Sequence, residues 1–256
     1  MKLFRGYLAL IVVSLGMLSS DLIQRLIIGP WTYFRPANRQ QILTWWINWL
    51  SWLVTRPIEL VGGGSIQRPS TVPCEPGSLI LMNHQSVFDV ALAEYAVQDG
   101  YANIVMRRRY TRWIPLISHL GRLYQYPWVD PTANPGGARR MLKALRKSAV
   151  ESQVPTAIFP EGTRSKDGEI GPFRPAGLSV ILKSRPWTVH AYVIDGLWQH
   201  AKFKHLIGSM SDIKGRCEFV GTFEWTDPKA DPAPFVAEIR ERMIEYLKQM
   251  REASDA

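Results

Sequence analysis

The chain has 256 residues and a net charge of +9. Hydrophobic residues make up 46% of the sequence, and charged residues make up 21%. This length can bury one substantial core, and the composition excludes a disordered chain. Two cysteines, Cys74 and Cys217, exclude a disulfide scaffold and give no sign of an oxidising compartment. The positive charge indicates an anionic partner, either lipid headgroups or nucleic acid.

The N-terminal residues predict membrane association. Residues 7–18 are nearly all apolar, and a second apolar run at 22–28 follows a polar break. The first run is shorter than the ~20 residues that a perpendicular span requires. The two runs would therefore form one long, imperfect span or two helices that dip into one leaflet. A signal peptide is the alternative, but no Ala-x-Ala-like cleavage site follows, so we expect an uncleaved anchor.

Four tryptophans crowd the next segment, namely Trp45, Trp46, Trp49 and Trp52. Tryptophan favours the membrane–water boundary, so we expect interfacial placement, with a buried core helix as the alternative. We divide the chain into residues 1–60, which form membrane-anchoring and interfacial helices, and residues 61–256, which form one α/β domain. Three glycines at 62–64 link the two parts.

Strand-like and helix-like segments alternate through the second part. The strand-like runs lie at residues 79–82, 102–106, 156–159, 189–194 and 217–223, and amphipathic helical patterns lie at residues 137–150 and 235–250. Strands that alternate with helices predict an α/β fold in which helices cover a sheet.

A histidine and an aspartate five positions apart, His84 and Asp89, lie between the run at 79–82 and a helical pattern at 90–97. Side chains five apart on a regular helix diverge by about 140°. The two therefore meet only if His84 precedes the helix and Asp89 lies in its first turn. Asp89 would then accept from one imidazole nitrogen and leave the other as a general base. No Gly-x-Ser-x-Gly sequence and no adjacent Cys–His pair supplies a nucleophile, so a substrate hydroxyl would attack.

The same residues also have a structural interpretation. Ser86 with Asp89 three positions later resembles a capping box, in which the acid satisfies N–H groups at the start of a helix. A lone histidine is more often structural than catalytic. The spacing by itself leaves both interpretations open.

A second polar cluster follows the strand-like run at 156–159. Pro160 ends that strand, and Gly162 permits a tight turn that also carries Glu161, Thr163 and Arg164. An arginine on such a loop can bind a phosphate through its planar guanidinium. An ordinary exposed turn is the alternative.

Taken together, Asn-His-x-x-x-x-Asp and Phe-Pro-Glu-Gly-Thr-Arg-Ser resemble the motifs of the glycerolipid (lysophospholipid) acyltransferases, in order and in separation. This family includes bacterial 1-acyl-glycerol-3-phosphate acyltransferase. The resemblance implies a mixed central sheet flanked by helices, and acyl transfer from acyl-CoA or acyl-carrier protein to a lysophospholipid hydroxyl, with no metal or other cofactor. It makes His84 the general base and Asp89 its partner. It assigns acceptor binding to Glu161, Gly162, Thr163 and Arg164.

Two further blocks of the family match less well. The stretch at 121–131 lacks the arginine expected at its far end, so Arg122, or residues 107–109, would contact the acceptor phosphate; residues 188–194 lack the usual Val-Pro. The preferred acceptor is 1-acyl-glycerol-3-phosphate, which gives phosphatidic acid. The alternatives are acyltransfer or transacylation to another lysolipid or a lyso-ornithine-type lipid, and hydrolysis of a membrane lipid.

Residues 107–113 carry four arginines and would suit nucleic acid, but no zinc-finger spacing or other nucleic-acid-binding motif accompanies them. Anionic headgroups attract the same charges. We expect membrane lipids, the lysophospholipid and the acyl donor as partners, and no nucleic acid. Because acyl donors are cytosolic, we expect the cytoplasmic (inner) membrane, with the catalytic domain on its cytosolic face. A non-catalytic lipid- or nucleic-acid-binding protein is the alternative to an enzyme.

Overall fold

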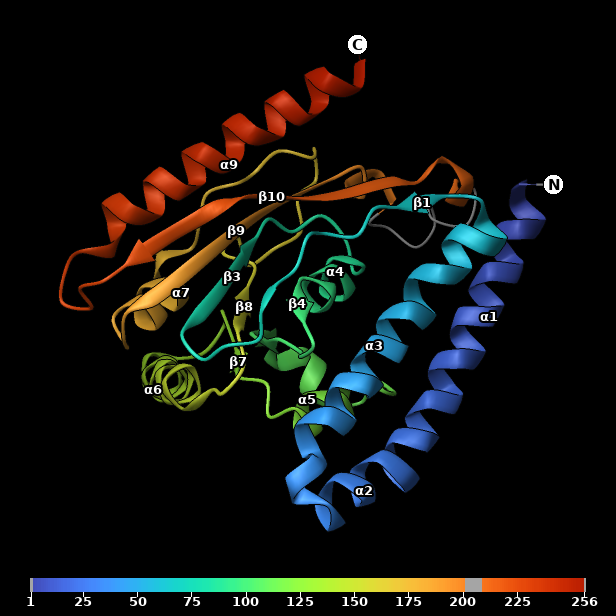
Figure 1. Ribbon diagram of the computed structural model, residues 1–256, viewed down its shortest axis with the longest axis horizontal. Helices are drawn as coiled ribbons and strands as arrows, with labels where there is room; N and C mark the ends of the chain where they lie inside the picture. The colour runs from blue at the N-terminus through green and yellow to red at the C-terminus, as the bar shows by residue number, and fades with distance from the viewer. Residues whose placement is uncertain (1, 201–208, 256) are drawn as a thin grey trace.

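A six-stranded sheet lies at the centre of the computed structural model, which describes residues 2–200 and 209–255 (Figure 1). In spatial order its strands are β1 (Ser65–Ile66), β10 (Lys214–Trp225), β9 (Trp187–Asp195), β3 (Ser78–Met82), β8 (Thr156–Ile158) and β5 (Asn103–Ile104). β9 and β10 pair antiparallel, and the other neighbours pair in parallel. The predicted mixed sheet is confirmed, and each predicted strand-like run contains a strand.

Two pairs of short strands lie outside this sheet, β2 (Val72–Pro73) with β4 (Val97–Gln98) and β6 (Met106–Arg107) with β7 (Trp128–Val129). The α-helices are α1 (Lys2–Ile23), α2 (Gly29–Phe34), α3 (Arg39–Pro57), α4 (Asp89–Tyr95), α5 (Ile117–Leu123), α6 (Pro135–Glu151), α7 (Pro175–Leu182) and α9 (Pro232–Asp255). The helical patterns at 137–150 and 235–250 fall within α6 and α9, as expected.

The central strand β3 is buried on both faces. Leu79 and Leu81 pack in one hydrophobic core, and Ile80 and Met82 pack in a second. This division follows from strand geometry, in which successive side chains point to opposite faces. Burial on both sides also explains why β3 is a continuous apolar run rather than an alternating one.

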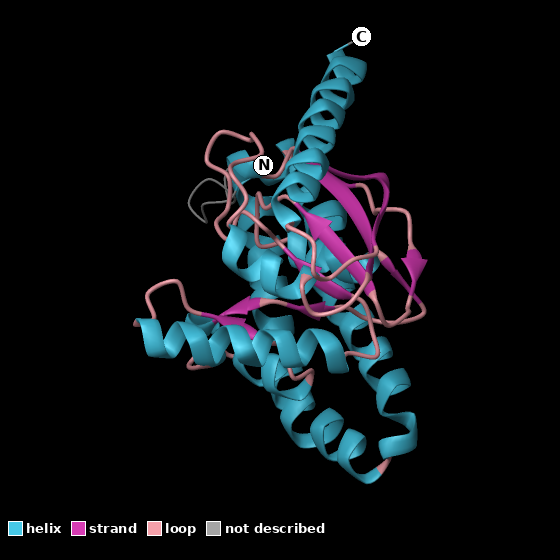
Figure 2. Ribbon diagram, turned by 90° about the vertical axis from the view of Figure 1, so that its left-hand side faces the viewer, coloured by secondary structure: helices cyan, strands magenta, loops and turns pink. Residues whose placement is uncertain are grey.

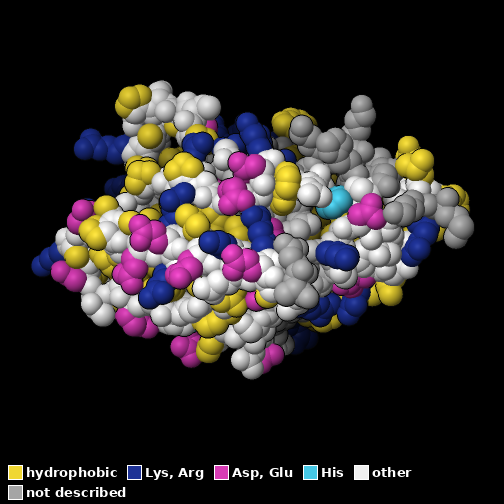
Figure 3. Space-filling view, turned by 90° about the horizontal axis from the view of Figure 1, so that it is seen from above, with side chains coloured by type: hydrophobic (Ala, Val, Ile, Leu, Met, Phe, Trp, Pro, Cys, Tyr) yellow, Lys and Arg dark blue, Asp and Glu magenta, His cyan; other side chains and the backbone are white. Residues whose placement is uncertain are grey.

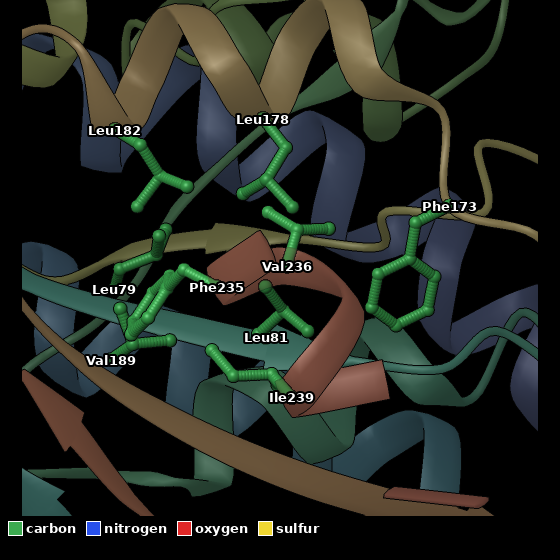
Figure 4. A pocket seen from close by; sticks show the side chains of 9 residues that line it. All are labelled: Leu79, Leu81, Phe173, Leu178, Leu182, Val189, Phe235, Val236 and Ile239. Carbon is green, nitrogen blue, oxygen red and sulfur yellow. The ribbon is translucent and has the colours of Figure 1, made fainter. Parts of the chain in front are cut away.

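The two cores are closed by different helices. The first lies beneath α7 and α9, and the second lies beneath α3 and α4. Figure 4 shows the first, where side chains of α7, α9, β3 and β9 converge. The space that they enclose is lined by apolar residues alone and is too narrow for a water molecule. It is therefore a packing seam of the core.

Residues 2–34 form one continuous helical arm in which a π-helical turn (Gln24–Ile28) joins α1 to α2. The arm and α3 make a hairpin that extends beyond the sheet (Figures 1 and 2). By length and composition alone, Leu3–Phe34 is a candidate for crossing a membrane, and few of its side chains are buried. The two apolar runs thus belong to one helix. Whether that helix crosses the bilayer or lies in one leaflet stays a prediction.

The tryptophans of α3 divide between core and surface. Trp46 is 1% exposed and its indole N–H donates to Gln24 Oε1 at 2.8 Å, whereas Trp45, Trp49 and Trp52 are exposed. Interfacial placement is therefore wrong for Trp46, because its face of α3 belongs to the core. α3 shares this core with α4. The domain boundary expected at residue 60 stays a prediction.

Glu94 of α4 gives the fold an expected pH dependence. Burial raises its pKa to about 7, although the Tyr126 hydroxyl and the Ala102 N–H both donate to the carboxylate. A raised pKa means that the folded state favours the neutral acid. The resulting stability is fully present below the unfolded pKa of 4.5 and is lost as pH rises to about 7.

In the wild type, the free energy of unfolding should fall by about 3 kcal/mol between those pH values, at ~1.4 kcal/mol per pKa unit. Glu94→Gln has no ionisable group at this position, so we expect this fall to be absent in the variant. The amide can still accept from Ala102 and meet the Tyr126 hydroxyl. Urea unfolding in detergent at a series of pH values measures the difference. Parallel pH profiles for the wild type and the variant would contradict the assignment.

Candidate active site

His84 lies in the turn between β3 and α4, and Asp89 is the first residue of α4. His84 Nδ1 is 2.7 Å from Asp89 Oδ2, which also accepts from the N–H groups of Gln85 at 2.5 Å and Ser86 at 2.7 Å. A carboxylate only accepts, so Nδ1 carries the proton and Nε2 is left as the basic nitrogen. The prediction that His84 precedes the helix and Asp89 begins it is confirmed. The predicted capping box is present only in part. Asp89 accepts from the Ser86 N–H, but the Ser86 hydroxyl makes no hydrogen bond in the described part of the chain, and the residue before α4 is Phe88.

The pair is shielded on one side and open on the other. Asp89 is fully buried, whereas the His84 side chain is 21% exposed. Nε2 of His84 has no hydrogen-bond partner in the described part of the chain. A buried anion at the start of α4 also benefits from the positive end of the helix dipole. The arrangement therefore presents a held imidazole, with one free nitrogen, to an incoming group.

The second motif lies against His84. The Ser165 N–H donates to the His84 carbonyl at 2.6 Å, and Glu161 Oε1 accepts from the His84 N–H at 2.9 Å. The Phe159 ring stacks on the imidazole, with centroids 4.5 Å apart. β3 and β8 are parallel neighbours, so the loops that follow them leave the sheet at the same edge.

The Glu161 carboxylate is used within the protein. Oε1 binds the His84 N–H, and Oε2 accepts from the Gly171 N–H at 3.0 Å. Glu161 is 6% exposed, and burial raises its pKa despite these two N–H donors. Its visible role is to join the histidine turn to the segment that follows the second motif.

The rest of this turn has the geometry that the sequence predicted. Gly162 has φ +65°, and a Cβ there would lie 2.9 Å from Arg174 Cδ, so the tight turn requires glycine. Thr163 and Arg164 follow on the same turn, with exposed side chains. The structure thus brings four of the predicted acceptor-binding positions next to the His–Asp pair.

Arg122 lies elsewhere. It is on α5, and its Nε donates to the Ser118 carbonyl one turn back at 3.1 Å. Burial lowers the pKa of His119, and the charges of Arg25 and Arg122 lower it further. His119 in turn contacts Gln24 of the N-terminal arm. Arg122 is therefore placed beside the helical hairpin, with no contact to the histidine turn among the described residues.

A polar network behind the histidine turn was not expected from the sequence. Gln85 Nε2 donates to the Gly168 carbonyl at 3.3 Å and to Asp195 Oδ1 at 3.4 Å, and Gln85 Oε1 accepts from the Leu197 N–H at 3.0 Å. Arg251, near the end of α9, donates to both Asp195 oxygens, at 3.1 and 3.0 Å, and to the Gly168 carbonyl at 2.9 Å. Burial acts to raise the pKa of Asp195, but the hydrogen bonds and charge of Arg251, together with hydrogen bonds from the Gly196 N–H and from Gln85, lower the pKa overall.

Part of this network had a signal in the sequence. Asn83 and Gln85 flank the histidine, and the Asn83 amide pairs with both the N–H and the carbonyl of Ile194. Asp195 ends β9, the parallel neighbour of β3, so its position at the same sheet edge follows from the strand order. Arg251 had no such signal, because only the packing of α9 brings it there.

We expect Arg251→Ala to lower kcat about tenfold, the effect of losing ~1.4 kcal/mol of positioning in the transition state. KM for the acceptor should change little, because Arg251 reaches the histidine turn indirectly, through Asp195, Gly168 and Gln85. Arg251→Lys keeps the charge and should restore part of the rate. Steady-state kinetics of the three proteins, with thermal unfolding alongside, measure this. A change in melting temperature with an unchanged kcat would contradict the positioning role.

The fold and this site define a class of α/β protein. Its members have a histidine held by a carboxylate at the carboxyl edge of the sheet, with an arginine-bearing turn beside it. The model of the family described as Acyltransferase matches residues 65–194, about half of the chain, and includes both motifs. This protein belongs to the acyltransferase family.

Two curated relatives are both named 1-acyl-sn-glycerol-3-phosphate acyltransferase. One, from Cocos nucifera, is 28% identical over 162 residues, 62% of this chain and 48% of that protein. The other, from Limnanthes alba, is 25% identical over 182 residues, 71% of this chain and 60% of that protein. The chain thus spans about half to three fifths of the length of these relatives. The crystal structure of the 1-acyl-sn-glycerophosphate (LPA) acyltransferase PlsC from Thermotoga maritima matches 98% of both chains with a TM-score of 0.69 and 17% identity, which shows a common fold.

Proposed function

We propose that this protein is an O-acyltransferase that moves a fatty acyl group from acyl-CoA or acyl-carrier protein to the free hydroxyl of a lysophospholipid. The acceptor that we propose is 1-acyl-glycerol-3-phosphate, with phosphatidic acid as the product. The observation that carries this proposal is the His84–Asp89 pair, with Nε2 free beside the turn of Arg164. The relatives named for this reaction support the choice of acceptor.

In the proposed reaction the acceptor hydroxyl lies against His84 Nε2. Nε2 takes the hydroxyl proton as the oxygen attacks the thioester carbonyl, and a tetrahedral intermediate forms. The C–S bond then breaks, and the leaving thiolate takes the proton from Nε2, which restores the neutral imidazole. Asp89 holds the ring and stabilises the transient imidazolium. General-base assistance of this kind contributes about 10²- to 10⁴-fold, and positioning must supply the rest.

Acceptor binding is assigned to the turn of the second motif. Arg164 would bind the phosphate through its guanidinium, with Thr163 beside it, while Gly162 and Glu161 keep the turn against the histidine. Arg122, next to the hairpin, would meet a headgroup arriving from the membrane side. The steps require no metal and no cofactor other than the acyl donor.

The setting that we propose is the cytoplasmic membrane. The apolar arm Leu3–Phe34 supports membrane association, because it exposes most of its side chains. The catalytic domain would lie on the cytosolic face, where acyl donors are made. Membrane lipids and the lysophospholipid are then reached from the bilayer and the donor from the cytosol.

The test is acyl transfer by the purified full-length protein in detergent. Labelled acyl-CoA and acyl-carrier protein are each offered with lysophosphatidic acid, with zwitterionic lysophospholipids and with a lyso-ornithine lipid. We expect transfer, with the highest kcat/KM for lysophosphatidic acid. Preference for an acceptor without a terminal phosphate would overturn the assigned acceptor. Release of free fatty acid without consumption of any acceptor would make the protein a hydrolase instead.

A further inference from the structure

A tryptophan that is almost entirely exposed marks the segment between β6 and α5. Trp113 is 96% exposed, and its backbone has φ +65°. A bulky residue rarely adopts the left-handed region, and it does so where the surrounding structure enforces it. We call residues 108–116 the Trp113 loop. It presents an almost fully exposed indole to solvent.

Hydrogen bonds hold this loop in a defined shape. The Ser118 hydroxyl accepts from the Ile114 N–H at 2.9 Å and donates to the Tyr110 carbonyl at 3.1 Å. The Thr111 hydroxyl donates to the Arg108 carbonyl at 2.8 Å. These hydrogen bonds fix the backbone on both sides of Trp113.

The Trp113 loop is also tied to the apolar N-terminal arm. The Leu116 N–H donates to Asp21 Oδ1 at 2.8 Å, and the buried Gln24 amide donates to the Leu116 carbonyl at 3.2 Å. Beyond these two anchors the arm exposes a run of large apolar side chains, namely Leu22, Ile23, Leu26, Ile27, Trp31, Tyr33 and Phe34. The end of the loop is therefore joined directly to the apolar arm.

The charge of the loop is basic. Residues 107–113 contain four arginines and no acidic residue. Arg108 pairs with Asp130 at 3.3 Å, Arg109 lies over the Tyr110 ring, and Arg112 has no acidic partner in the described part of the chain. The face that carries α9 is different, since basic and acidic side chains are mixed across it (Figure 3). The excess positive charge at the loop therefore contrasts with the mixed charge on the face of α9.

We propose that the Trp113 loop is a second membrane contact, in which the indole enters the bilayer interface and Arg109 and Arg112 bind anionic headgroups. Tryptophan beside arginine suits this boundary, where the ring is apolar and the surface is anionic. Continuity with the apolar arm favours a lipid surface over nucleic acid. The arm and the loop would together fix the orientation of the catalytic domain on the bilayer. The inference rests on the membrane setting proposed above.

The first test locates Trp113 by fluorescence. The full-length protein and Trp113→Phe are reconstituted into vesicles of phosphatidylcholine and phosphatidylglycerol, with or without brominated phosphatidylcholine. We expect the emission of Trp113, obtained as the difference between the two proteins, to be quenched by brominated lipid and protected from aqueous iodide. Quenching by iodide with no effect of brominated lipid would overturn the proposal.

The second test isolates the charge. Flotation gives the partition of each protein into vesicles with and without phosphatidylglycerol, and the ratio of the two cancels the contribution of the apolar arm. Arg112→Gln should lower this ratio about fivefold, the effect expected for one basic residue near an anionic surface. Arg242→Gln, an exposed arginine of α9, is the matched control and should leave the ratio unchanged.

Equal ratios for the two variants would contradict the headgroup contact. If Arg112→Gln instead weakens binding to a DNA duplex and leaves flotation unchanged, the loop is a nucleic-acid site and the membrane proposal is wrong. Acyl transfer in detergent micelles should be the same for the wild type, Trp113→Phe and Arg112→Gln. If the wild type shows no acyl transfer, the proposed function is wrong. The quenching and flotation results still decide whether the Trp113 loop contacts the membrane, because neither depends on acyl transfer.

Discussion

Replacement of His84 by alanine is expected to lower the rate of acyl transfer by about 10²- to 10⁴-fold, the range for loss of a general base. The reason is geometric, because Nε2 of His84 is basic, faces the site and has no hydrogen-bond partner among residues 2–200 and 209–255. The protein should remain folded. The side chain is 21% exposed, and Asp89 keeps its two backbone N–H donors when the imidazole is removed. Initial rates with saturating donor and acceptor measure the effect.

The control is His119→Ala, which removes a histidine from α5, outside the turns that form the site. It should retain transfer within a few-fold of the wild type. Transfer by His84→Ala at the wild-type rate would sink the general-base mechanism and favour a binding protein. Loss of transfer in both variants would point to a folding defect, which thermal unfolding in the same detergent would reveal.

Asp89→Asn is expected to give the second largest loss, about 10²-fold or more in kcat, because an amide cannot stabilise the imidazolium that forms when His84 takes a proton. The asparagine oxygen can still accept from the N–H groups of Gln85 and Ser86, so the turn should persist. KM should change little, since Asp89 is fully buried and does not reach the acceptor. Kinetics at several pH values measure kcat and KM separately.

Asp89→Ala separates the two roles of the carboxylate. It leaves two buried N–H groups without an acceptor, each of which costs about 1–3 kcal/mol, so it should lose stability as well as activity. Asp227→Asn is the matched control, because Asp227 also accepts a backbone N–H, at 2.9 Å from Lys229, but is exposed and far along the chain from the site. An Asp89→Asn protein as active as this control would show that the charge is not needed.

The sequence by itself determined how His84 and Asp89 lie relative to each other and where they lie in the fold. A histidine and an aspartate five positions apart cannot meet on one helix, so they had to lie on either side of a helix start, and they do. Pro160 and Gly162 marked a turn, and the strands before the two motifs were recognisable as apolar runs. These features are local, because each depends on backbone preferences within a few residues. That the two loops lie side by side follows from β3 and β8 being parallel neighbours.

Tertiary structure alone decided the surroundings of that site. Arg251 reaches Asp195 from a helix at the other end of the chain, and no local pattern records such a contact. Trp46 lies in an aromatic stretch and is 1% exposed, whereas Trp113 lies in a basic stretch and is 96% exposed. Burial depends on which face of an element meets another element, and that is set by long-range packing. The two backbone N–H groups that the Glu161 carboxylate accepts from, those of His84 and Gly171, are likewise contacts that no local pattern records.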